Sequence, residues 1–419
     1  MEFKEQKLAN LCTVNQGLQI PISKRYKEPG INRFFYITVQ FLKGNTDQYY
    51  IENPKKSVIC NKNEILVVRT GNTGQVLTNV EGCFHNNFFK VTPKEIILPG
   101  FLYYSLNNIK MYNKMISVAS GTTILDLNHS SFLNLEINLP SIINQKKIVD
   151  ILTSIDLKIQ INNKINENLQ KVSQILFKRW FLDFEFPNEE SKPYKSSGGV
   201  MVESEFGLIP DGWSVINITK ICKKISKGST PTKEDFENSN GEKTIMFIKV
   251  KDVSNEKNIL LKNVELIPID IHEKTLKRSI VLEDDILFSI AGTIGRTAII
   301  TKELNESNIN QAIAFIRLKD VAFKSYIYNV LKNKEFQSNI KSKIVQGVQE
   351  NLSLGVLGNE KIVFSESYTF LYLVEKLDVI LNETINLISE NEYLSKLKDI
   401  LLPKLLNGEI NLENINLEV

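Results

Sequence analysis

The chain has 419 residues, of which 42% are hydrophobic and 24% are charged. These values are ordinary for a folded globular protein with two or more domains. The formal net charge of +3 is too small to indicate a nucleic-acid partner by itself. The charge is unevenly spread, because residues 1–140 hold 15 Lys and Arg against 10 Asp and Glu, a net of 15 − 10 = +5. This mild positive field suits a polyanionic partner, although a solvated surface gives the same count.

The composition also argues against several other classes of protein. The four cysteines show no CxxC spacing, so neither a zinc site nor a disulfide framework is predicted. The first residues lack the apolar segment of a signal peptide, and no apolar run approaches the ~20 residues of a membrane span. We therefore expect a protein of the reducing cytoplasm without membrane contact.

The first 140 residues predict a mixed α/β domain. A short helix at 8–12 leads to a turn at Gly17, and a longer helix is predicted over 100–115. Strands are predicted at 34–41, 57–60, 64–69, 87–91 and 135–139. Because Pro140 ends the last of these strands, the first domain is predicted to span residues 1–141.

A long amphipathic helix is predicted next, within a segment at 142–187. Its apolar residues recur mainly at steps of three and four, which is typical of a helix that packs on a partner helix. Adding 225 to their numbers gives a second apolar seam near the C-terminus, which indicates an internal repeat. The predicted seam residues are Ile148, Leu152, Ile155, Ile159, Leu169, Val172 and Leu176 in the first helix, and Leu373, Leu377, Ile380, Leu394, Leu397 and Leu401 in the second.

The globular segments repeat as well. Residues 36–39 align with 247–250 at an offset of 211, and the glycine turn 71–74 aligns with 292–295 at an offset of 221. Drifting offsets indicate loop insertions within one scaffold, which is how one fold can read two targets. The remaining predicted segments are a linker at 188–207, a second domain at 208–365, a C-terminal helix at 366–408 and a tail at 409–419.

The simplest arrangement packs the two helices antiparallel, as a coiled-coil spacer with one domain near each end. A helix over residues 145–180 would measure roughly 50 Å at ~1.5 Å per residue, compared with ~34–36 Å for one turn of duplex DNA. Two readers on such a spacer could contact one side of a duplex about one turn apart. Asn166 and Asn391 lie on or beside the seam, and they either fix its register when buried or point to solvent.

The loops predicted to contact double-stranded DNA are the glycine turns and their basic neighbours. Arg and Lys can bind guanine edges or phosphates, Asn and Gln can pair with adenine, and Ser, Thr and turn amides can hold phosphates. For each residue alone, an ordinary surface side chain is the alternative. The candidates are Lys24, Arg25, Arg69, Asn72, Thr73 and Gln75 in the first domain, and Lys227, Ser229, Thr230, Lys233, Arg296 and Gln349 in the second.

No active site of an enzyme is predicted. None of the three histidines has a second histidine at ligand spacing, so no metal site is expected. The glycine turns lack both the Gly-Lys-Ser/Thr of a P-loop and the third glycine of a dinucleotide fingerprint. The dipeptide at 53–54 is Asn-Pro, without the second proline and the aromatic residue of an amino-methyltransferase.

Three runs of sequence resemble the specificity subunit of type I restriction–modification enzymes. The first is Leu-Pro-x4-Gln-Lys-Lys-Ile-x3-Leu-x3-Asp at 139–156, at the start of the first long helix. The other two, Phe-Lys-Arg-Trp-Phe-Leu-Asp-Phe-Glu-Phe-Pro at 177–187 and Glu-Ser-Glu-Phe-Gly-Leu-Ile-Pro-Asp-Gly-Trp at 203–213, are more specific. The resemblance covers essentially the whole chain.

The resemblance implies a non-catalytic subunit with two target-recognition domains. Each domain would read one half of a split, asymmetric DNA sequence, and the helices would set the gap between the halves. Two modification subunits, which use S-adenosylmethionine to methylate adenine, would dock on this scaffold. Restriction subunits that use ATP and Mg²⁺ would complete the enzyme, and the chain itself would bind no cofactor.

The second repeat departs from the family pattern. Ser365 and Phe370 stand where the first repeat has Pro140 and Gln145, so the first residue of the C-terminal helix is left open. Two alternative functions also remain. One is a coiled-coil scaffold whose domains bind proteins, and the other is an enzyme with its own methyltransferase activity.

Overall fold

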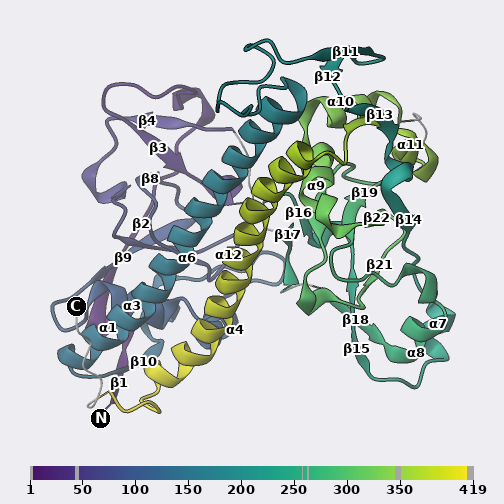
Figure 1. Ribbon diagram of the computed structural model, residues 1–419. Helices are drawn as coiled ribbons and strands as arrows, with labels where there is room; N and C mark the ends of the chain where they lie inside the picture. Colours follow the sequence, from purple (N-terminus) through teal and green to yellow (C-terminus); the bar gives the residue numbers. More distant parts are fainter. Residues whose placement is uncertain (1–2, 43–46, 257, 262–263, 345–350, 413–419) are drawn as a thin grey trace. The chain divides into compact units, whose positions relative to one another are not determined.

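The computed structural model describes residues 3–42, 47–256, 258–261, 264–344 and 351–412 (Figure 1). Two compact units share the long helices: unit 1 comprises residues 1–159 and 393–419, and unit 2 comprises residues 160–392. The fold class predicted from the sequence, two similar α/β domains with two long helices, is confirmed. The domain boundaries given above stay predictions.

Unit 1 is built on two four-stranded sheets and a short two-stranded ribbon. One sheet has the order β2-β9-β6-β7, the other β4-β3-β8-β5, and β1 pairs with β10. All pairs are antiparallel except β3 with β8. The strands are β1 (Lys4–Lys7), β2 (Cys12–Gln16), β3 (Arg33–Ile37), β4 (Tyr50–Glu52), β5 (Ile59–Cys60), β6 (Ile65–Val68), β7 (Val76–Leu77), β8 (Gly82–Phe84), β9 (Phe88–Pro93) and β10 (Glu136–Leu139). The short helices are α1 (Leu8–Leu11), α2 (Val39–Leu42), α3 (Pro99–Leu106), α4 (Ile109–Val118) and α5 (His129–Leu133).

Three predicted elements of unit 1 need correction. The strand predicted over 34–41 ends at Ile37, and its second half forms α2. Residues 57–60 form only the two-residue strand β5, after a 3₁₀ turn. The helix predicted over 100–115 is two helices, because the Asn108 side chain accepts a hydrogen bond from the Met111 amide at 2.9 Å and starts a new helix.

Unit 2 repeats this plan: its main sheet has the same strand order, and its second sheet has three strands instead of four. Its main sheet is β14-β22-β19-β20, its second sheet is β18-β15-β21, and β13 pairs with β23 as β1 does with β10. The second sheet of each unit contains one parallel strand pair, which is β3 with β8 in unit 1 and β15 with β21 in unit 2. The strands are β11 (Met201–Ser204), β12 (Gly207–Pro210), β13 (Ser214–Asn217), β14 (Cys222–Lys227), β15 (Lys243–Ile248), β16 (Val253–Ser254), β17 (Asn258–Ile259), β18 (Glu265–Pro268), β19 (Ile286–Ser289), β20 (Thr297–Ile299), β21 (Asn308–Ile309), β22 (Ile313–Leu318) and β23 (Lys361–Phe364). The short helices are α7 (Lys233–Glu237), α8 (Ile269–Glu273), α9 (Lys324–Lys332), α10 (Lys334–Ser342) and α11 (Leu354–Asn359).

Gly17 and Gly228, which the repeat aligns at the same offset of 211, occupy one structural position. The Gly17 amide donates to the Phe88 carbonyl at 3.0 Å, and the Gly228 amide donates to the Ile313 carbonyl at 3.0 Å. A Cβ on Gly17 would collide with the carbonyl oxygen of His85, and a Cβ on Gly228 would collide with that of Ile309. Each position therefore needs glycine because two backbone segments approach closely.

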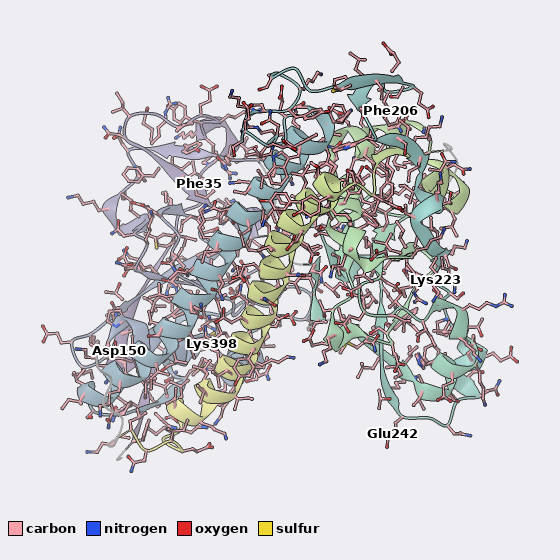
Figure 2. All side chains as sticks on the ribbon, viewed as in Figure 1. Phe35, Asp150, Phe206, Lys223, Glu242 and Lys398 are labelled. Atoms are coloured by element: carbon pink, nitrogen blue, oxygen red, sulfur yellow. The ribbon has the colours of Figure 1, made fainter. Side chains whose placement is uncertain are left out.

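The two long helices are α6 (Ile142–Phe177) and α12 (Tyr368–Leu406). Within unit 1, Lys398 of α12, labelled in Figure 2, pairs with Asp156 of α6 at 2.5 Å. Within unit 2, the Asn162 side chain donates to the Asn391 side chain at 3.0 Å. Further along α6 in the same unit, Gln174 lines a small cavity together with Ile380 and Leu381 of α12, which precede Asn391, so the two helix segments run antiparallel in unit 2.

Most of the predicted seam is covered, with one exception. Val172 is 45% exposed, so its assignment to the seam is wrong. In this part of α6, the buried face includes polar side chains: Asn162 is 0%, Asn166 5% and Ser173 8% exposed. The buried seam residues are Ile148, Leu152, Ile155, Leu373 and Leu377, and the half-buried ones are Ile159, Leu169, Leu176, Ile380, Leu394, Leu397 and Leu401.

The structure decides the placement of Asn166 and Asn391 and the first residue of the C-terminal helix, which the sequence left open. Asn166 is buried, but its side chain accepts a hydrogen bond from Gln170 of the same helix, at 3.5 Å. Asn391 is half-buried and bonds across to the other helix, where it donates to Asn163 at 3.0 Å. The C-terminal helix begins at Tyr368, after a serine whose hydroxyl accepts a hydrogen bond from the Phe370 amide at 3.3 Å.

Candidate nucleic-acid interface

In unit 1 the first candidate loop follows β2. Arg25 donates from two nitrogens to the Ile20 carbonyl, at 2.9 and 2.7 Å, and its guanidinium lies 5.0 Å from the centre of the Tyr36 ring. Arg25 is thus held against the domain, whereas the neighbouring Lys24 is exposed. We assign Lys24 as a free cation of this loop and Arg25 as its anchor.

The second candidate loop is the glycine turn between β6 and β7. Arg69 binds Asp126 with two hydrogen bonds, at 2.5 and 2.7 Å, and the guanidinium lowers the pKa of that carboxyl. Thr73 is 6% exposed, and its hydroxyl donates to the Leu125 carbonyl at 2.8 Å. Because this side chain is buried and bonded within the domain, the prediction that it contacts DNA is wrong. Asn72 and Gln75 are half-buried and keep amide groups at the surface, where they bond to each other at 3.4 Å.

Both loops pack against the end of β3. Arg25 stacks on Tyr36 of this strand, and a Cβ on Gly71 would touch the side chain of Val39, which follows it. Arg33, which is not among the residues predicted from the sequence, also belongs here, because its guanidinium lies 3.6 Å from the centre of the exposed Tyr26 ring. Basic and aromatic residues alternate over 24–36, and this pattern is typical of nucleic-acid surfaces.

In unit 2 the corresponding loop follows β14. Lys227, Ser229, Thr230 and Lys233 are exposed, and the Thr230 hydroxyl donates to the side chain of Gln311. Lys233 is the first residue of α7, a one-turn helix with a capping box. Gln349 lies outside the described residues.

The second glycine turn of unit 2 borders a basic recess. Arg296 follows this turn and donates to the carbonyls of Val250 and Val253, at 2.9 and 3.1 Å, so it fixes the loops as Arg25 does in unit 1. Beside Gly295 the recess has a volume of about 500 Å³. It is lined by Lys332, Lys334 and Lys341. These lysines are not among the residues predicted from the sequence, because they lie on helices rather than in loops. Three lysines in one recess could hold phosphates.

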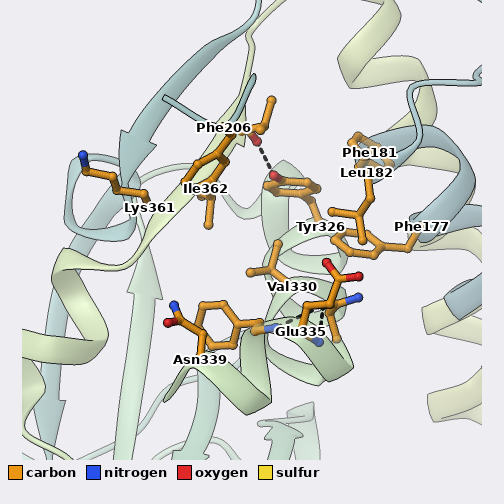
Figure 3. A pocket seen from close by; sticks show the side chains of 13 residues that line it. Phe177, Phe181, Leu182, Phe206, Tyr326, Val330, Glu335, Asn339, Lys361 and Ile362 are labelled. Atoms are coloured by element: carbon orange, nitrogen blue, oxygen red, sulfur yellow. Dashed lines mark hydrogen bonds between the residues drawn. The ribbon is translucent and has the colours of Figure 1, made fainter. Parts of the chain in front are cut away.

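An apolar pocket lies on another side of unit 2 and has a counterpart in unit 1. This pocket has a volume of about 220 Å³, and the Tyr326 hydroxyl in it donates to the Val363 carbonyl. Phe206 and Tyr326 both line the pocket (Figure 3). The unit 1 pocket, of about 90 Å³, is lined by residues that include Ser105, Asn108, Lys110, Met111, Lys114, Glu136, Ile137 and Asn138. Each of these differs by 225 from a residue that lines the first pocket. The repeat therefore extends to its cavities, but the candidate loops do not reach them.

The reactive groups of the described residues show no catalytic arrangement. Burial raises the pKa of the Cys12, Cys60 and Cys222 thiols to about 12, which keeps them protonated at neutral pH. No three His, Cys, Asp or Glu side chains in the described ranges come together as a metal site. None of the helices in the described part of the chain has the length and apolar composition that crossing a membrane requires.

A duplicated α/β domain with polar loops, joined by a long helix pair, defines a recognition protein with two reading surfaces. The family model described as "Type I restriction modification DNA specificity domain" matches residues 1–171 and 210–390, and the chain belongs to this family. It is a type I restriction–modification specificity subunit with two target-recognition domains. Such subunits are non-catalytic DNA-recognition subunits.

Relatives of similar length support the assignment. The chain is 26% identical over 377 residues to the type I restriction enzyme HindI specificity subunit of Haemophilus influenzae, covering 77% of this chain and 80% of that protein. It is also 26% identical over 388 residues to the type I restriction enzyme MjaVIII specificity subunit of Methanocaldococcus jannaschii, covering 91% and 87%. The crystal structure of the type I S subunit from M. genitalium shares the fold, with a TM-score of 0.59 at 15% identity over 97% of this chain and 96% of that one.

Proposed function

We propose that each target-recognition domain reads one half of a split, asymmetric site in double-stranded DNA, and that α6 and α12 set the gap between the halves. The observation that carries this proposal is one strand order used twice with different loop residues. The candidate loops of unit 1 present Lys24, Asn72 and Gln75, whereas those of unit 2 present lysines and hydroxyls. Two such surfaces on one chain favour two different half-sites.

The long helices also offer surfaces for modification subunits. On α6 the exposed residues Ile161, Ile165, Val172 and Ile175, at 41–64% exposure, are spaced for one helical face. On α12 the exposed Tyr372 and Val379 lie seven residues apart within unit 2, and the exposed Tyr393 and Ile400 lie seven residues apart within unit 1. Apolar stripes with this period suit a partner helix. One apolar surface on each long helix matches two modification subunits. The modification subunits would supply S-adenosylmethionine-dependent methylation, and restriction subunits would supply the steps that need ATP and Mg²⁺. This chain itself would bind none of these cofactors.

The test is methylation mapping of DNA from cells that express the chain with its modification subunit. We expect a split adenine-methylated motif with one fixed gap, absent when this chain is omitted. A continuous motif, or no new methylation from two subunits that are shown to associate, would instead favour the coiled-coil scaffold.

Two alterations separate the parts of the proposal. Replacing residues 1–140 by another such domain should change one half-site and leave the other intact, and a change in both halves would contradict independent readers. Inserting four residues, about one helical turn, near Asn166 should lengthen the gap without altering the bases. An unchanged gap would rule out the spacer role.

A further inference from the structure

One polar contact recurs at equivalent places in the two units, made by different side chains. In unit 1 the Asn86 amide donates to the Gln19 amide oxygen at 3.5 Å. In unit 2 the Thr230 hydroxyl donates to the Gln311 amide oxygen. Gln19 and Thr230 differ by the offset of 211 that relates Gly17 to Gly228, and Asn86 and Gln311 differ by the offset of 225 that relates the starts of β9 and β22.

The backbone around each pair is fixed without help from these side chains. Each pair joins the loop after the tight glycine to the connection that leads into the next strand of the main sheet. In unit 1 the Leu18 amide donates to the Phe84 carbonyl at 3.1 Å, and the His85 amide donates to the Ile37 carbonyl at 3.0 Å. In unit 2 the Asn310 amide donates to the Ile248 carbonyl at 3.0 Å. Because backbone groups hold both frames, the side chains can differ without changing the fold.

The side chains keep hydrogen-bonding groups that the protein does not use. Gln19, Thr230 and Gln311 are exposed. Within the described residues, the amide nitrogens of Gln19 and Gln311 have no hydrogen-bond partner, so each exposed side chain keeps a donor free. The Asn86 amide oxygen also lacks a partner there, but it is shielded from solvent. A side-chain amide that offers a donor and an acceptor matches the major-groove edge of adenine, and a hydroxyl accepts more than one base.

We propose that the pairs Gln19–Asn86 and Thr230–Gln311 are base-reading residues of the first and the second half-site. Their different chemistry on one frame makes the two domains prefer different bases. This inference rests on the proposed function, since it names the residues by which each domain would read its half-site.

The test exchanges the pairs between the frames in the full chain, expressed with its modification subunit. Gln19→Thr with Asn86→Gln places the unit 2 pair in unit 1. We expect a change in the DNA half-site that the domain at residues 1–141 reads, or a fall of about 5–100-fold in the preference of this domain for one or two of its base pairs. The other half-site and the gap should stay unchanged. The reciprocal Thr230→Gln with Gln311→Asn should alter the other half only.

The matched control is a second exposed amide contact of unit 1, where Asn10 donates to Gln6 at 3.3 Å. Gln6→Thr with Asn10→Gln should leave the motif unchanged. An unaltered motif in the exchanged variants, with methylation proceeding, overturns the inference. Lost methylation with an unchanged Tm supports a recognition role, whereas lost methylation with a lowered Tm assigns the pair to the fold and overturns it. A wild-type chain that yields no split motif refutes the proposed function instead.

Discussion

The two long helices start at equivalent places in the repeat, yet different chemistry anchors them. In α6 the buried Gln145 donates to the carbonyls of Ile96 and Pro140, at 3.2 and 3.0 Å, and accepts from the Leu98 amide at 2.8 Å. In α12 the equivalent Phe370 is fully buried, with its ring centre 5.0 Å from those of Trp213 and Tyr326 and 5.1 Å from that of Phe181. One backbone frame thus accepts a fully bonded amide or an aromatic ring, provided that the space is filled and polar groups are paired.

The glycine turns differ in the same way. In both units a backbone hydrogen bond ties the residue before the turn to a distant segment, from the Leu127 amide to the Arg69 carbonyl at 3.1 Å and from the Leu352 amide to the Ile290 carbonyl at 2.8 Å. In unit 1 the Arg69 side chain extends outward to Asp126, whereas the equivalent Ile290 is 2% exposed. An ion pair therefore supports a loop in one unit that apolar burial supports in the other.

The largest effect is expected from Phe370→Ala. It removes the ring at the centre of the aromatic cluster and should lower the free energy of unfolding by about 3–5 kcal/mol, measured by urea denaturation. Tyr372→Ala, two residues further on and 45% exposed, is the control and should change stability by less than about 0.5 kcal/mol. Similar losses in both variants would contradict the anchoring role.

A smaller effect is expected from Gln145→Ala. It leaves two buried carbonyls and one amide without their partner, which should cost about 2–3 kcal/mol in the same measurement. If Gln145→Ala lowers the free energy of unfolding by as much as Phe370→Ala or more, hydrogen bonds rather than buried apolar area contribute most to anchoring these helices.

The close glycine contacts should respond alike in the two units. Gly17→Ala and Gly228→Ala force a carbonyl away from the new Cβ, and we expect each to lower stability by about 1–3 kcal/mol. Gly355→Ala in α11 serves as the control, because its nearest neighbour would be the Ser353 hydroxyl at 3.9 Å. A tolerated alanine at only one of the two contacts would show that the frames differ there.

The smallest effect is expected from Asp126→Asn. The Arg69 pair is about 30% exposed, so its loss should cost about 1 kcal/mol at neutral pH. The folded state lowers the pKa of Asp126, so the pair's contribution is complete above the ordinary value of 3.8 and is lost as the pH falls through the lowered value. The Tm difference between variant and wild type should therefore shrink in acid. A constant difference would assign the effect to packing.

The local pattern of the sequence was enough for much of the fold. The two long helices follow from apolar spacing, because a helix turns every ~3.6 residues, and the repeat with the equivalence of Gly17 and Gly228 follows from the recurring offsets in the sequence. The break at Asn108 was missed because a capping side chain overrides an apolar period. Val172 was misplaced because an apolar residue at helical spacing can face a partner or solvent equally well.

Only the tertiary structure decided which polar side chains are free for recognition. Arg69 and Arg296 look like DNA contacts in the sequence, yet each is bonded to groups about 40 to 60 positions away in the chain. Gln19 and Asn86 lie 67 positions apart, so no local pattern brings them together. The sequence by itself therefore determined the family, the repeat and the helices, which depend on neighbouring residues. The tertiary structure decided the assignment of partners and surfaces, because hydrogen bonds form between groups that the fold places within about 3 Å, whatever their separation along the chain.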